Sequence, residues 1–204
     1  MDAKLWGLIH FPCDSITITN HLSRFAGYND FSMCELGVAD GRTGCRMVEF
    51  LKTIDVKNIK YFGVDNLSLI ECNLNERKIP IFEFDEMVFV DGDRKILDSL
   101  PLMDFAFVDA CHCAECVYHD GIAMSKIVKV GGTMAFHDTS LMWQYPQGRS
   151  LEKEFWQHGN FTRPIGVVEG IVMGRGKWDG EWNLVTQEGD DLIWGGLRIY
   201  EKIS

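Results

Sequence analysis

The stretch Glu35-Leu36-Gly37-Val38-Ala39-Asp40-Gly41 decides how the rest of the chain is interpreted. It overlaps the end of a segment, 32–36, that is typical of a short buried strand. It also precedes a segment, 45–54, in which apolar residues recur at the spacing of one helix face. Small residues at positions 37, 39 and 41 let a ligand approach the backbone where that helix begins. Because glycine turns after strands are common, this turn needs support from the rest of the sequence.

The alternation of strand-like and helix-like segments continues to residue 139. Further strands are expected at 61–64, 87–90, 105–108 and 133–136, and each is followed by an acidic residue or by His137-Asp138. A helix is expected at 114–130, ended by Gly131-Gly132. Strands that alternate with helices indicate a parallel sheet with helices on both faces.

The two ends of the chain depart from this alternation. Near the start, Ser15 is expected to cap a helix that turns Ile16, Leu22 and Phe25 inward. After residue 139 the sequence predicts a short helix at 150–157 and then three closely spaced strands, at 165–173, 182–186 and 192–202. Strands this close in sequence pair antiparallel, which places them at one edge of the sheet.

Composition narrows the possible functions. Of the 204 residues, 46% are hydrophobic and 25% are charged, which suits one globular domain with a full core. The formal net charge is −10 and no basic run is present, so we expect no nucleic-acid partner. We also expect no membrane partner and no signal peptide, because the apolar stretches are only strand-length. Seven cysteines without the spacing of a disulfide scaffold favour a cytoplasmic location.

Acidic residues recur where the predicted strands end. In an open parallel sheet, ligands bind beyond the carboxyl ends of the strands. The residues found there are Glu35, Asp65, Asp91, Asp93, Asp109 and Asp138. Asp65 is well placed to accept hydrogen bonds from two ribose hydroxyls. A nicotinamide dinucleotide is disfavoured, because Ala39 and Arg42 replace the second and third glycines of Gly-x-Gly-x-x-Gly.

Five features in this order resemble the class I S-adenosylmethionine-dependent methyltransferases. They are the turn at 35–41, Gly63-Val64-Asp65, Gly92-Asp93, the run 104–109, and Gly131-Gly132 leading into His137-Asp138. The resemblance implies an α/β fold with a Rossmann-like, doubly wound seven-stranded sheet, mostly parallel with an antiparallel C-terminal strand pair. It also implies a single domain over 1–204, with a helical cap at 1–30, a cofactor-binding core at 31–139 and a substrate-shaping segment with the antiparallel edge at 140–204.

The resemblance further implies how S-adenosylmethionine would bind. Glu35, Gly37 and Gly41 would hold its methionine end and backbone, and Asp65 would hold its ribose. Ala39 stands where the middle glycine is usual, and we expect it to tighten packing rather than abolish binding. The remaining predicted cofactor-binding residues follow the later strands: Asn66, Gly92, Asp93, which would face the adenine, and Asp109.

Asp109-x-x-His112 followed by His137-Asp138 resembles the metal-dependent small-molecule O-methyltransferases. This resemblance implies that Asp109, His137 and Asp138 bind a divalent metal of the Mg or Mn type, and that His112 removes the proton of a substrate hydroxyl. A hard cation prefers carboxylate oxygens and lowers the pKa of a bound hydroxyl. A histidine with a pKa near ~6.5 can accept that proton. The histidine at 137 favours Mn²⁺, Fe²⁺ or Zn²⁺ over Mg²⁺.

Alternatives remain open at this stage. A metal-independent methyltransferase would use His112 or His137 only as a base, and a non-catalytic module would keep the fold and the cofactor without turnover. His112 could instead cap the helix that follows it. Cys111, Cys113 and Cys116 suggest zinc, although their spacing favours ordinary buried thiols. We expect a small-molecule methyl acceptor and a possible homodimer, and we expect Asp120 to be solvated.

Overall fold

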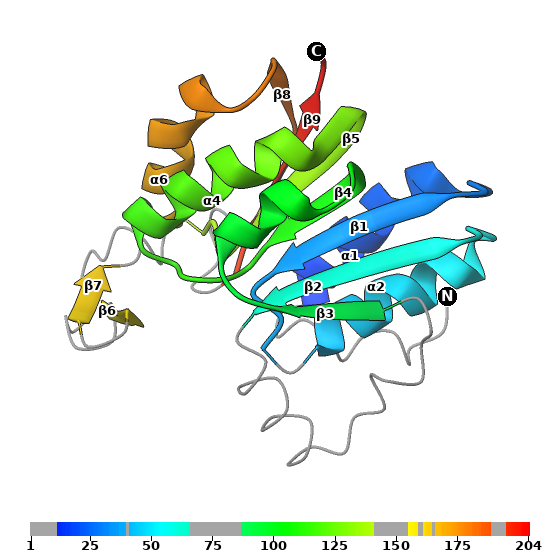
Figure 1. Cartoon of the computed structure of the whole chain (residues 1–204), viewed down its shortest axis with the longest axis horizontal. Coiled ribbons are helices and arrows are strands. Elements are labelled where there is room, and N and C mark those ends of the chain that lie inside the picture. Colours follow the sequence, from blue (N-terminus) through cyan, green and yellow to red (C-terminus); the bar gives the residue numbers. More distant parts are fainter. Residues whose placement is uncertain are drawn as a thin grey trace.

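The computed structural model describes residues 12–39, 41–65, 87–140, 155–158, 161–164, 166–188 and 195–204. Within them, a seven-stranded sheet has the order β3-β2-β1-β4-β5-β9-β8 (Figure 1). Its strands are β1 (Phe31–Leu36), β2 (Ile59–Asp65), β3 (Met87–Asp91), β4 (Met103–Val108), β5 (Val128–His137), β8 (Trp182–Glu188) and β9 (Leu197–Lys202). The pairs β5–β9 and β8–β9 are antiparallel and the others are parallel, so the predicted fold class is confirmed.

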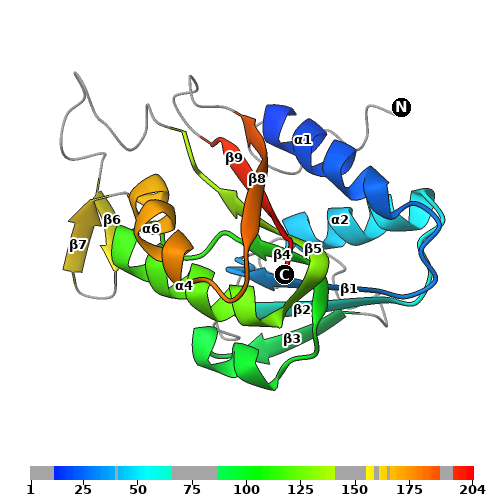
Figure 2. The ribbon, with the colours of Figure 1, turned by 90° about the horizontal axis from the view of Figure 1, so that it is seen from above.

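Helices cover both faces of the sheet (Figure 2). One face carries α1 (Pro12–Leu22), the 3₁₀ turn η2 (Ser23–Phe25) and α2 (Arg42–Thr53), which share one hydrophobic core with the sheet. The other face carries η4 (Arg94–Ser99), α4 (Ala114–Ile127) and α6 (Val167–Gly174), which pack in a second core, and α6 is followed by the 3₁₀ turn η6 (Arg175–Lys177). A separate two-stranded hairpin is formed by β6 (Phe155–His158) and β7 (Phe161–Pro164).

Central strand β4 shows why the sequence folds in this way. Phe105 and Phe107 belong to the core under α1 and α2, whereas Ala106 and Val108 belong to the core under α4. Side chains of a strand alternate between its two faces, and both faces of this sheet are covered. A continuous apolar run is therefore the pattern that a buried parallel strand requires.

The strand register aligns the ends of four parallel strands. Leu36 of β1 pairs with Val64 of β2 and with Val108 of β4, and Val108 pairs with Phe136 of β5. The residues immediately after these positions therefore lie along one edge of the sheet. They are Gly37, Asp65, Asp109 and His137. The predicted site residues meet because of this register.

Two details predicted for the helices are wrong. Ser15 does not cap the first helix: it lies inside α1, where Ile18 is buried and Ile16 is 39% exposed. Leu22 and Phe25 are buried as expected. At the other boundary, α4 ends at Ile127, and positions 131 and 132 lie within β5 rather than stopping the helix.

The region after residue 139 contains the largest error. Residues 167–173 of the strand expected at 165–173 lie in helix α6, and Phe155–Gln157, expected to be helical, lies in β6. The strand expected at 182–186 is β8. Of the strand expected at 192–202, residues 197–202 form β9, whereas residues 195 and 196 precede it. Residues 150–154 and 192–194 lie outside the described part of the chain. Among the helices that the structure describes, none has the length and apolar character to cross a membrane.

Candidate active site

The glycine turn, which we define as residues 37–41 after β1, is described at residues 37–39 and 41, and its start is fixed against the neighbouring strands. Gly37 has a φ of 93°, and its N–H donates to the Val64 carbonyl at 2.9 Å. A Cβ at Gly37 would lie 2.2 Å from the carbonyl oxygen of Asp109, so only glycine fits here. Gly41, with a φ of 71°, then provides the N-cap of α2. The turn therefore brings its backbone directly against the end of β4.

Asp65 holds the glycine turn in shape. Its Oδ2 accepts hydrogen bonds from the N–H of Val38 at 2.8 Å and from that of Ala39 at 2.9 Å. Ala39 has a φ of 50°, the left-handed region in which glycine is at ease and alanine is strained. The structure thus shows that Asp65 stabilises the turn, a role that the sequence did not predict. The contact of Asp65 with a ribose stays a prediction.

Glu35 lies beneath the turn rather than at its surface. It is 1% exposed and accepts a hydrogen bond from the hydroxyl of Tyr61, itself fully buried. Burial, together with the neighbouring Glu35, raises the pKa of Tyr61 well above its ordinary value. The first turn of α2 packs on this pair, because a Cβ at Gly44 would lie 2.4 Å from the Tyr61 hydroxyl oxygen. Tyr61 is a site residue that sequence reasoning missed.

The end of β3 lies beside Asp65. The N–H of Gly92 donates to the Asp65 carbonyl at 3.2 Å, and Asp93 follows as an exposed residue. The Oδ1 of Asp93 caps η4 by accepting from the N–H of Lys95 at 2.9 Å. Its predicted contact with adenine stays a prediction, and Asn66 lies outside the described residues.

Beyond β4 and β5, four side chains form what we call the acid–histidine cluster: Asp109, His112, His137 and Asp138. The Nε2 of His112 lies 3.3 Å from Asp109 Oδ1 and 3.2 Å from Asp138 Oδ2. The Nδ1 of His137 lies 3.2 Å from Asp109 Oδ1 and 3.5 Å from Asp138 Oδ2. Each histidine therefore bridges the two carboxylates, and the structure brings all four predicted residues together.

The close contacts in the cluster shift the pKa values of Asp109 and His137 in opposite directions. Burial raises the pKa of Asp109, but the charge of His137 and hydrogen bonds from both histidines outweigh it, so the net shift is downward. Burial lowers the pKa of His137, but Asp109 and Asp138 outweigh it and leave that pKa well above its ordinary value. The raised pKa of His137 favours a positively charged imidazole beside the carboxylates of Asp109 and Asp138.

The donor atoms of the cluster fit a divalent metal. One ligand atom from each of Asp109, His137 and Asp138 can be chosen so that all three lie within 4.8 Å of one another. Two carboxylates and an imidazole suit a cation such as Mn²⁺. The Asp109 side chain is 26% exposed, against 8% for that of Asp138, so Asp109 forms the open side of the cluster.

Asp138 has a strained backbone that its surroundings maintain. Its φ is 56°, the left-handed region, and such strain at a non-glycine residue is typical of functional sites. The next two residues are fixed by hydrogen bonds, from the N–H of Thr139 to the Gly196 carbonyl at 3.2 Å and from that of Ser140 to the Gly195 carbonyl at 2.8 Å. Gly195 and Gly196, just before β9, therefore fix the two residues that follow Asp138.

Helix α6 supports the segment that carries His112, and sequence reasoning missed it. The N–H of Gly166, its N-cap, donates to the His112 carbonyl at 2.9 Å. A Cβ at Gly170 would lie 2.5 Å from the Ala114 carbonyl oxygen, and one at Gly174 would lie 3.2 Å from that of Tyr118. Glycines four residues apart form a smooth ridge on a helix, and that spacing was the signal in the sequence.

Asp120, in α4, is a further residue whose role sequence reasoning missed. It was expected to be solvated, but it is 3% exposed and accepts from Arg94 Nη1 at 2.6 Å. Burial raises the pKa of Asp120 to about 6, although Arg94 acts in the opposite direction. The ion pair ties η4, at the end of β3, to the helix that follows His112.

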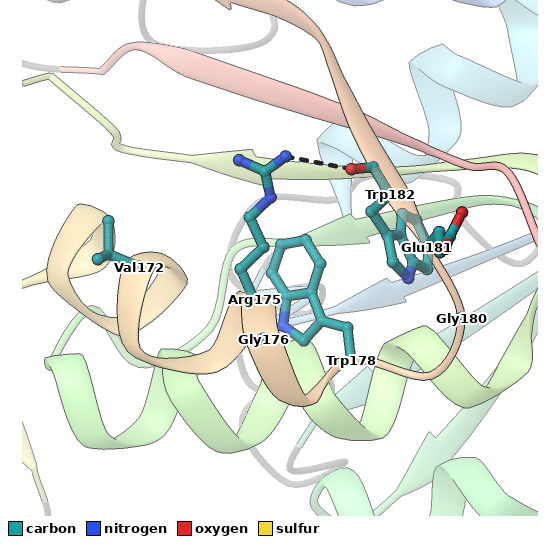
Figure 3. A pocket seen from close by; sticks show the side chains of 7 residues that line it. All are labelled: Val172, Arg175, Gly176, Trp178, Gly180, Glu181 and Trp182. Carbon is teal, nitrogen blue, oxygen red and sulfur yellow. Dashed lines mark hydrogen bonds between the residues drawn. The ribbon is translucent and has the colours of Figure 1, made fainter.

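A cavity of about 520 Å³ lies elsewhere, between η6 and the start of β8 (Figure 3). It is lined by Trp178, Trp182 and other residues of 172–182, and Arg175 crosses it to donate to the Trp182 carbonyl at 3.1 Å. Trp182 pairs with Lys202 at one end of β9, whereas His137 pairs with Leu197 at the other. The cavity is therefore separate from the predicted site.

Comparisons with known proteins support the fold. No family model and no curated protein matches the chain. Among solved structures, an O-methyltransferase family protein from Burkholderia thailandensis is 13% identical with a TM-score of 0.61, over 93% of this chain and 56% of that one. The O-methyltransferase TomG from Streptomyces achromogenes, solved with S-adenosylmethionine, is 14% identical with a TM-score of 0.55, over 92% and 78%.

An N-methyltransferase is equally similar. NodS from Bradyrhizobium japonicum is 13% identical with a TM-score of 0.58, over 96% of this chain and 98% of that one. The predicted resemblance to class I S-adenosylmethionine-dependent methyltransferases is therefore confirmed at the level of the fold. Because folds host many activities, the function must be argued from the site.

Proposed function

We propose that this chain transfers the methyl group of S-adenosylmethionine to a hydroxyl of a small molecule, with the help of a divalent cation. One observation carries the proposal. The backbone of Asp109 packs against Gly37 of the glycine turn, while its carboxylate lies 3.2 Å from His137 and 3.3 Å from His112. A methyl donor on the turn and a hydroxyl on the cluster would therefore meet beside one residue.

Each residue has a distinct task in this proposal. The turn 37–41, shaped by Asp65, would bind the methionine and ribose parts of the cofactor through backbone and carboxylate contacts. Asp109, His137 and Asp138 would hold the cation, which lowers the pKa of a coordinated hydroxyl. His112, in contact with both acids, would accept the hydroxyl proton. Asp109, on the open side of the cluster, would admit the acceptor.

The charge of the chain supports a small acceptor. The formal net charge of −10 and the absence of a basic run leave little to attract a nucleic-acid backbone. A hydroxyl acceptor is favoured over an amine. An amine needs no cation to become nucleophilic, whereas a cation activates a hydroxyl, and the cluster supplies the ligands for a cation.

The test is methyl transfer from labelled S-adenosylmethionine to a panel of catechols and sugars, with Mn²⁺ or Mg²⁺. We expect transfer that a chelator abolishes and added metal restores. Asp138→Asn removes a ligand charge yet tolerates the left-handed backbone, so it should lose metal-dependent transfer while still binding the cofactor. Asp98→Asn is the matched control, because its 68% exposed side chain pairs with Lys126 away from the site.

Other outcomes would separate the alternatives. Transfer that survives chelation and Asp138→Asn would exclude the metal and leave His112 or His137 as a base alone. Cofactor binding without transfer to any acceptor would favour a non-catalytic module of the same fold.

A further inference from the structure

A second cluster of metal-ligating side chains lies beside the site and takes no part in the proposed reaction. The sulfur atoms of Cys111, Cys113 and Cys116, which we call the thiol cluster, lie within 4.8 Å of one another. The Sγ atoms of Cys111 and Cys113 are 3.5 Å apart, and no disulfide joins the three residues. Cys113 and Cys116 are buried, whereas Cys111 is partly exposed.

We propose that the thiol cluster binds one thiophilic divalent cation of the Zn²⁺ type through three thiolates. Zinc–sulfur bonds of about 2.3 Å at tetrahedral angles place two ligand sulfurs about 3.8 Å apart. The observed separations reach no more than 4.8 Å, so the three sulfurs are already close to this arrangement. A disulfide would use only two of them, which leaves the position of the third unexplained.

Burial raises the pKa of the Cys111 and Cys116 thiols, so their deprotonation would be coupled to binding of the cation. Two nearby features can compensate the negative charge that results. Cys113 is the N-cap of α4, a helix of 14 residues, so the cluster lies at the positive end of the helix dipole. The guanidinium of Arg94 interacts with Cys116 as well as with Asp120. Three thiolates around a dication carry one net negative charge, and a helix N-terminus with a nearby arginine compensates it.

The thiol cluster differs from the acid–histidine cluster in its donors. Thiolates select soft ions, whereas carboxylates and imidazole accept harder ones, so the two clusters would bind different cations. Two of the thiols, Cys111 and Cys113, flank His112 in the sequence. An ion at the thiol cluster would therefore fix the backbone on both sides of His112 to the start of α4.

The experiment is a titration of the reduced, metal-free chain with Cd²⁺, followed by the ultraviolet charge-transfer band of cadmium thiolate. We expect saturation at one ion per chain. Cys111→Ser, the least buried of the three positions, should weaken binding at least about tenfold without unfolding the chain. Asp138→Asn should leave the band unchanged, because a carboxylate contributes no thiolate absorption. Cys45→Ala, which removes a buried thiol outside the cluster, should also leave it unchanged.

Three results would overturn the proposal. The first is the absence of a thiolate band in the reduced chain. The second is an unchanged band in Cys111→Ser and in Cys116→Ser, both shown to be folded by circular dichroism. The third is a disulfide within 111–116 in the purified chain, combined with no cadmium uptake after reduction, which would identify a redox pair. None of these results depends on whether the chain transfers methyl groups.

Discussion

The two halves of the predicted site are built in different ways. The cofactor half, at the ends of β1 and β2, is shaped by backbone: Gly37 fits against Asp109, and one carboxylate, Asp65, accepts two N–H groups of the turn. The chemical half, at the ends of β4 and β5, consists of four charged or titratable side chains within hydrogen-bonding distance. The first half is fixed by backbone contacts and hydrogen bonds. The second half contains two adjacent carboxylates, and a bound cation would relieve the repulsion between them.

This difference predicts that the halves fail separately when they are altered. A change in the chemical half should alter turnover and leave cofactor affinity unchanged. A change in the cofactor half should alter affinity or stability. Gly37 is the exception, because it belongs to the turn and contacts the backbone of Asp109.

The largest expected effect is that of His112→Ala on turnover. Losing a general base should lower kcat by about two to four orders of magnitude, with cofactor affinity unchanged. His119→Ala is the control, because His119 is an exposed histidine of α4, the helix that follows His112. Single-turnover methyl transfer measures the effect. A loss of less than about threefold, in a variant that is folded, would remove His112 from the mechanism.

Gly37→Ala should disturb both halves of the site, because Gly37 packs against the backbone of Asp109. The added Cβ meets backbone atoms of Asp109 that cannot turn away, and the φ of 93° is itself unfavourable for alanine. We expect a loss of roughly 2–5 kcal/mol in the free energy of unfolding, measured in urea. Gly131→Ala shares the positive φ, at 79°, but has no atom within 4 Å of the added Cβ, so it should cost only about 1–2 kcal/mol. Equal losses of unfolding free energy in the two variants would show that Gly37 does not pack tightly against Asp109.

Asp65 separates the shape of the turn from the binding of the ligand. Asp65→Ala should weaken S-adenosylmethionine binding by about 1–3 kcal/mol, because both the turn and the ribose lose an acceptor. Asp65→Asn keeps one oxygen for the N–H groups of Val38 and Ala39 and should lose less. Calorimetry of both variants distinguishes these effects. Identical affinities for both variants and the unaltered chain would exclude Asp65 from the site.

The smallest expected effect is that of Ala39→Gly. Removing the Cβ from a residue with a φ of 50° should stabilise the chain by about 1 kcal/mol or less, because glycine also gains freedom in the unfolded state. Turnover should not change. A loss of stability would show that the Ala39 methyl group makes contacts that outweigh its strain.

The same comparison explains how much could be predicted from sequence. The strands, the glycine turn and the acids that follow the strands were predictable, because they depend on local patterns and on the register of parallel strands. Helix α6 was not, because its apolar, valine-rich sequence also suits a strand and only its glycine spacing indicates a helix. The Tyr61–Glu35 and Arg94–Asp120 pairs were not predictable either, since residues 26 positions apart meet only through tertiary packing.

The most direct test of the account is calorimetric titration of the chain with S-adenosylmethionine and, separately, with NADH. The glycine turn, with Ala39 and Arg42 in place of two glycines, predicts that S-adenosylmethionine binds one per chain and that NADH does not bind. Binding should weaken in Asp65→Ala and persist in His112→Ala. Binding of NADH with no binding of S-adenosylmethionine would contradict the cofactor assignment and, with it, the proposed reaction.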